Sequence, residues 1–95
     1  MNINESLCYA VVHNKRLLVR TLLKIGASPN THDGHKKTLL MYAVQNGSLS
    51  IVKMLIKAKA DIHEQDKHGR TALHLAKKLH RTKIISLLEK ADKAE

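Results

Sequence analysis

The feature that most constrains this 95-residue chain is a match to itself when it is shifted by 33 positions. The match needs no insertion, and internal repetition with a period of roughly 20–50 residues is typical of stacked repeat architectures. Leu7 and Ala10 extend the pattern one period earlier, so we expect three units, at about residues 4–32, 33–65 and 66–95. The identities between the second and third periods include Asp33 with Asp66, His35 with His68, Thr38 with Thr71, Leu40 with Leu73, Ala43 with Ala76, Ile51 with Ile84 and Leu55 with Leu88.

Each period begins with a polar turn that leads into a threonine and a short apolar segment. Glycine permits positive φ and aspartate hydrogen-bonds local backbone, so both suit tight turns. Thr38 and Thr71 then stand where a helix N-cap would accept a backbone N–H. Gly47 stands where the first helix of the middle unit should end. The turns are Asp33-Gly34-His35-Lys36 and Asp66-Lys67-His68-Gly69.

The second half of each period carries apolar residues at i, i+1, i+3 and i+4, which predicts an amphipathic helix. The chain has no Phe or Trp, and Tyr9 and Tyr42 are its only aromatic residues apart from histidine. Its core must therefore be built of small and aliphatic side chains, which suits thin, closely packed helical layers. The apolar positions are Ile51, Val52, Met54, Leu55 and Ala58 in the middle unit and Ile84, Ile85, Leu87 and Leu88 in the last.

The segment from Thr71 to Ala76, with the sequence TALHLA, resembles the T-P-L-H-x-A motif that opens the first helix of ankyrin repeats. Residues 26–30 resemble the segment that leaves the second helix in that family, and residues 59–63 are a divergent copy. The resemblance extends from about residue 4 to about residue 90. It implies an all-α, ankyrin-type helical solenoid of three stacked helix pairs with two β-hairpin fingers. It also implies that His74 is structural and hydrogen-bonds close to the capping threonine.

The chain departs from the family pattern at its turns and at its ends. Lys36 occupies the position of the hairpin glycine, so Gly34 is expected to supply the turn, and His80 stands where the first helix usually ends in glycine. The first unit begins directly at its helix, near Asn4, and the last ends in the charged tail 89–95. Because solenoids need polar ends to stop further stacking, we expect the first and last units to act as caps.

The net charge is +9, from 17 Lys and Arg against 8 Asp and Glu. Such a balance favours acidic partners and salt-sensitive association, although a surplus of lysine that serves only solubility is an equally open interpretation. The lone Cys8 excludes an intramolecular disulfide, and no signal core or membrane-length apolar run is present. We therefore expect a soluble, intracellular, cytoplasmic protein. The sequence does not distinguish a resident adaptor from an effector delivered into a host cell.

Catalytic and metal-binding motifs are weak in this sequence. It has no phosphate-binding loop, no H-E-x-x-H and no C-x-x-C, and Cys8 occupies a regular helical position that suits packing. Neighbouring units stack about 8–10 Å apart, wider than a zinc ion with ligands at about 2 Å bridges easily. We predict no enzyme activity, no catalytic residue, no cofactor and no metal, with metal binding by the turn histidines left open. The candidate ligands are His32, Asp33 and His35 in one turn and His63, Asp66 and His68 in the next.

The resemblance places a partner-binding surface on the hairpin tips and the exposed positions of the first helices. The residues at those positions include no carboxylate, which favours an acidic protein partner, and Val12, Tyr42 and Leu79 are candidate apolar anchors. The predicted function is thus a protein–protein interaction module: an adaptor, an inhibitor or a small effector. The predicted contact residues are Val12, His13, His32, His35, Lys37, Tyr42, Gln45, Asn46, Gln65, Lys67, His68, Arg70, Lys78 and Leu79.

Nucleic-acid or other polyanion binding is the main alternative for the basic residues. It would need a basic stripe with aromatic stacking platforms, and Tyr42 is the only aromatic residue near the fingers. The charge also wraps around the expected solenoid. Self-association through an end face is a further alternative, so we expect a monomer or weak self-association. The bases expected on the second helices, on the opposite side, are Arg20, Lys24, Lys53, Lys57 and Lys83.

Overall fold

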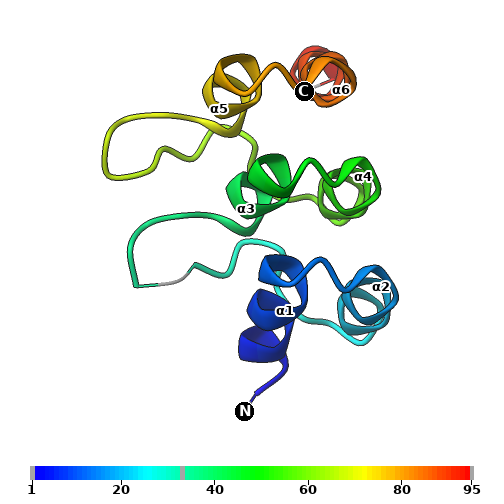
Figure 1. The fold of residues 1–95 in the computed structure, drawn as a ribbon. Coiled ribbons are helices and arrows are strands. Elements are labelled where there is room, and N and C mark those ends of the chain that lie inside the picture. The colour runs from blue at the N-terminus through cyan, green and yellow to red at the C-terminus, as the bar shows by residue number, and fades with distance from the viewer. Residues whose placement is uncertain (1, 33, 95) are drawn as a thin grey trace.

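The computed structural model describes residues 2–32 and 34–94. Asp33, for which the sequence predicted a role in a turn, lies outside the described residues. The six helices in the described part of the chain form three pairs stacked in one direction, with α1, α3 and α5 in one column and α2, α4 and α6 in the other (Figure 1). This arrangement confirms the all-α prediction. The helices are α1 (Ile3–Val12), α2 (Arg16–Lys24), α3 (Leu39–Asn46), α4 (Leu49–Lys57), α5 (Ala72–Lys78) and α6 (Thr82–Ala94).

Each helix pair packs on the next pair along the chain. Within a unit the contacts join α1 to α2, α3 to α4 and α5 to α6; between units they join α1 to α3, α3 to α5, α2 to α4 and α4 to α6. The Cα positions extend over 33 × 24 × 23 Å. Stability in such a stack depends on the interfaces between neighbouring units.

The first helices of the middle and last units begin at their threonines. The Thr38 hydroxyl accepts the backbone N–H of Met41 at 3.1 Å, and the Thr71 hydroxyl accepts that of His74 at 3.3 Å. His74 Nδ1 in turn accepts the backbone N–H of Thr71 at 3.1 Å, which completes a reciprocal capping box. His74 therefore helps to fix the start of α5.

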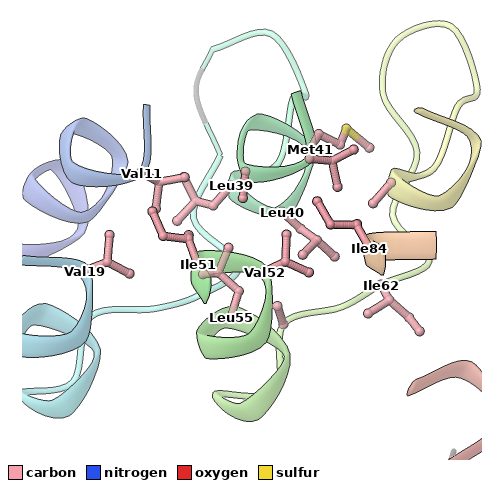
Figure 2. Close-up of a cluster of buried hydrophobic side chains, with 14 of the residues drawn as sticks. Val11, Val19, Leu39, Leu40, Met41, Ile51, Val52, Leu55, Ile62 and Ile84 are labelled. Carbon is pink, nitrogen blue, oxygen red and sulfur yellow. The ribbon is translucent and has the colours of Figure 1, made fainter. Parts of the chain in front are cut away.

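The core is a band of aliphatic side chains that runs across the stack (Figure 2). Leu7 and Leu40, which are one period apart, are 0% and 1% exposed, and Leu73 packs against the same core. Aliphatic layers fill the space between pairs without large aromatic rings. The core residues labelled in Figure 2 are Val11, Val19, Leu39, Leu40, Met41, Ile51, Val52, Leu55, Ile62 and Ile84.

The structure has loops where the sequence predicted β-hairpin fingers. We name residues 32–37 the first finger loop, of which residue 33 is not described, and residues 64–70 the second finger loop. No β-strand occurs in residues 2–32 or 34–94; one isolated bridge joins His32 to Thr38. An isolated two-stranded ribbon is only marginally stable in water. In the second loop the Asp66 side chain also accepts the backbone N–H groups of His68 and Arg70, at 2.8 and 2.9 Å, in place of a longer ladder.

Left-handed backbone conformations recur with the 33-residue period. In the first finger loop Lys36, which occupies the position of the hairpin glycine, adopts a φ of 61°, and the expectation that Gly34 supplies the turn stays a prediction. Lys36 is one period before Gly69, so the place in the repeat sets the backbone even where the side chain is unfavourable. The positive φ angles fall at Asn14 (56°), Gly47 (68°) and His80 (57°), at Gly26 (106°) and Lys59 (71°), and at Lys36 (61°) and Gly69 (76°).

Candidate partner-binding groove

A groove lies between the two finger loops and the first helices of the middle and last units. Figure 1 shows both loops projecting on the side of α3 and α5 that faces away from the second helices. The structure thus brings together seven of the contact residues predicted from the sequence and adds Asp66 and Leu75. The groove is lined by His35, Lys37, Tyr42, Gln45, Asp66, Lys67, His68, Arg70 and Leu75.

One wall of the groove holds a lysine in a fixed position. The Lys37 ammonium donates to the Gln45 side-chain oxygen and lies 4.3 Å from the centroid of the Tyr42 ring. An ammonium over an aromatic face is held by the negative potential of the ring. Lys37 is therefore a preorganised cation, and preorganisation reduces the entropy that a ligand must remove on binding.

The other wall contains an ion pair that the sequence did not predict. The Asp66 carboxylate is 8% exposed and accepts from Arg70 Nε at 2.9 Å. Its pKa is lowered from 3.8 to about 2, first by the backbone N–H of Arg70 and then by the N–H of His68 and the Arg70 guanidinium, against partial burial. Asp66 is ionised at neutral pH, so the charge of Arg70 is largely balanced. Arg70 lines the groove, and its role as a partner contact stays a prediction.

A second predicted contact, His32, also faces a carboxylate. Its Nε2 hydrogen-bonds to Glu64 of the second finger loop, and the two side chains are 40% and 29% exposed. Both residues border a shallow hollow that Gln65 also lines. With Asp66 and Glu64 both present, the predicted surface is less free of acids than its residue list suggested.

Asn46 was predicted as a partner contact, but it links two units. Its Nδ2 donates to the backbone carbonyls of residues 11 and 12, both at 3.2 Å. At the next junction between units, Arg81 Nε and Nη2 donate to the equivalent carbonyls, of residues 44 and 45, at 3.3 and 2.7 Å. These carbonyls lie at helix C-termini, where they lack intrahelical partners and attract donors and cations. The role of Arg81 was not predicted.

The remaining predicted contacts lie outside the groove lining. Val12 and His13 end α1, and the His13 ring lies 4.3 Å from that of Tyr9. Lys78 and Leu79 end α5, and Leu79 is 38% exposed. The structure therefore divides the predicted surface into a central groove and separate positions at helix ends.

Within residues 2–32 and 34–94, no three His, Cys, Asp or Glu side chains converge as metal ligands would. The absence of a metal or cofactor remains a prediction. The described helices include none that is both long and apolar enough to cross a lipid bilayer.

Comparison with known proteins supports the assignment of the repeat. The family model described as "Ankyrin repeats (3 copies)" matches residues 7–95, which is nearly the whole chain. No curated protein sequence matches it.

Proposed function

The chain belongs to the ankyrin-repeat family, whose members generally serve protein–protein interaction, and from this we propose a non-catalytic module that binds an acidic segment of a partner protein in its groove. The observation that carries the proposal is the Lys37 ammonium fixed over Tyr42, in a groove that Lys67 and His68 also line. We expect the module to act as an adaptor, an inhibitor or a small effector.

The groove combines fixed positive charge with apolar surface. Tyr42 and Leu75 provide the apolar part of the lining, and such anchors usually dominate affinity. Lys37 and Lys67 would pair with carboxylates of the partner and steer its approach. Because Asp66 is balanced by Arg70, it offsets little of that positive charge. We propose the cytoplasm as the location, since a chain with a single cysteine cannot form an intramolecular disulfide, which suits a reducing compartment.

A pair of charge-reversal variants tests the proposal. The groove variant is Lys37→Glu with Lys67→Glu. The matched control is Lys53→Glu with Lys57→Glu, which changes two exposed lysines on α4. After affinity capture identifies a partner, the groove variant should weaken its binding at least about tenfold, or about 1.4 kcal/mol, and the control should not. Arg70 is left unchanged because its loss would leave Asp66 unbalanced. Equal losses in both variants would contradict binding in the groove.

Polyanion binding is a second candidate because the opposite side of the stack also gathers bases. A groove between α2 and α4 is lined by Arg20, Lys24 and Lys57, with Leu23, Met54 and Ala58 between them. A gel shift with short single- and double-stranded oligonucleotides tests it, with the Lys53→Glu, Lys57→Glu variant as the one expected to lose binding. Phosphate contacts predict log affinity falling by roughly 0.7–0.9 per contact against log salt. No shift at low salt would contradict this candidate.

A further inference from the structure

Exposed apolar side chains concentrate on the first helix pair. Leu17 is 77% exposed, Ile25 60%, Tyr9 48% and Leu18 41%, and we name these four residues the N-terminal end face. Tyr9, Leu17 and Leu18 also line one hollow, which joins α1 to α2. The sequence predicted that the first unit acts as a cap, and these exposed apolar side chains give that end a less polar surface than a cap normally presents.

The repeat shows what normally covers such a face. Leu18 is one and two periods before Ile51 and Ile84, which are 0% and 3% exposed. Tyr9 is one period before Tyr42, which is partly buried, and two periods before Leu75, which is 3% exposed. In the middle and last units these positions are covered wholly or in part, and there α3 packs on α1, α4 on α2, α5 on α3 and α6 on α4. At Leu18 and Tyr9 the N-terminal end face therefore has the pattern of a surface on which this fold packs helices, and Leu17 and Ile25 extend its apolar area, so its shape complement is a helix.

The charge around the face specifies the helix further. Lys15 and Arg16 line the same hollow, and α2 carries three bases and no carboxylate. Glu5 is the only acidic residue in the first 32, and its side chain accepts the backbone N–H of Asn2 at the start of α1. A helix that covers this face without charge repulsion must carry acids beside its apolar stripe.

A second copy of the chain does not offer that complement. Two N-terminal end faces in contact would bring the bases of α2 in one copy toward those in the other. The opposite end carries Lys77 where the first and middle units have Val11 and Val44, so it offers a basic rather than an acidic surface at that position.

We propose that the N-terminal end face docks an acidic amphipathic α-helix of a partner protein, in the place that a preceding helix pair would occupy. The helix would set apolar side chains against Leu17, Leu18 and Ile25 and carboxylates against Lys15 and Arg16. This surface is separate from the groove between the finger loops, so the two proposals fail independently.

The test uses a synthetic, fluorescein-labelled peptide of about 18 residues, roughly five helical turns, with leucines at i, i+3, i+4 and i+7 and glutamates on both flanks. The controls are the same composition in scrambled order and a version with lysine in place of glutamate. Fluorescence anisotropy should show saturable binding of the acidic peptide alone. Leu17→Glu with Ile25→Glu should weaken binding at least about tenfold; both side chains are more than half exposed, so folding should survive.

Two variants with intact end faces complete the design. Leu79→Glu, at an exposed leucine that ends α5, should bind the peptide like the wild type, and so should the groove variant Lys37→Glu with Lys67→Glu. Equal binding of the scrambled peptide, an equal loss in the Leu79 variant or no saturable binding would overturn the proposal.

Two further outcomes would replace the helix with another occupant. Binding to phosphatidylserine vesicles, lost in the Leu17, Ile25 variant and without peptide binding, would assign the face to a lipid surface. A concentration-dependent dimer in sedimentation equilibrium that the same variant abolishes would assign it to a second copy. Either result would overturn docking of an acidic helix.

Discussion

The two ends of the stack share one backbone plan but present different surfaces. At the first end, Leu18 is 41% exposed at the position that is buried in the middle and last units, as Ile51 and Ile84. At the last end, Lys77 is exposed at the position where Val11 and Val44 are completely buried. The comparison shows that the repeat determines the chain path, whereas single residues at outward positions decide whether an end is apolar or polar.

The two ends can be compared directly at one repeat position, where Ile51→Ala should lower the free energy of unfolding far more than Leu18→Ala. Ile51 is fully buried between pairs, so truncation loses burial and leaves a cavity, at a cost of about 2–5 kcal/mol. Leu18 lacks a covering pair, and we expect its truncation to cost less than about 1 kcal/mol. Urea unfolding followed by circular dichroism measures both. Similar costs for the two would mean that the first end is covered in solution.

The helical part of the fold could be predicted because its sequence signals are local and recur in each unit. The TALHLA segment contains both the capping Thr71 and His74, and the 33-residue shift fixes the position of every helix pair. The loops were less predictable, because propensity favoured Gly34 for the positive φ that Lys36 adopts. At Lys36 the place in the repeat, one period before Gly69, outweighed the low preference of lysine for positive φ.

The position of the groove could be predicted from the sequence, but the pairing of its charged side chains could not. Its position follows from the repeat, whereas the pairing of Arg70 with Asp66 and of His32 with Glu64 depends on side-chain geometry that spacing does not determine. The N-terminal end face did have a signal in the sequence. The 33-residue shift places Leu17 on Ser50 and Lys83, so an apolar residue there is an exception within the repeat.

The two junctions between units should also differ in strength. Arg81 donates charge-assisted bonds to the end of α3, whereas Asn46 donates neutral bonds to the end of α1. We expect Arg81→Ala to cost about 1.5–3 kcal/mol and Asn46→Ala about 0.5–1.5 kcal/mol in urea unfolding. Lys78→Ala, at an exposed position near the end of α5, serves as the control and should be near neutral. A larger loss for Asn46 would reverse the inferred order of the junctions.

The second finger loop, which leads into α5, should lose stability in acid because the Asp66 carboxylate accepts backbone N–H groups within it. Its folded pKa of about 2 lies below the ordinary 3.8, so its contribution to stability is present above about pH 4 and is lost as the pH falls through 2. Asp66→Asn should therefore lower Tm near pH 6, and its difference from the wild type should shrink between pH 4 and 2. A difference in Tm that stays constant over this range would show that ionisation of Asp66 does not matter.

The smallest expected difference between the ends concerns the residues that follow their first helices. His80 and Asn14 both adopt left-handed φ, at 57° and 56°, and Gly47 does so at 68° in the middle unit. Asparagine tolerates this conformation better than histidine, so His80→Gly should stabilise the fold by about 0.5–1 kcal/mol and Asn14→Gly by only a few tenths. Gly47→Ala should destabilise it by about 1–3 kcal/mol, because the left-handed φ is strained for alanine and its Cβ would lie 3.1 Å from the Arg81 guanidinium. Equal gains at His80 and Asn14 in urea unfolding would mean that the strain at the two ends does not depend on the residue present.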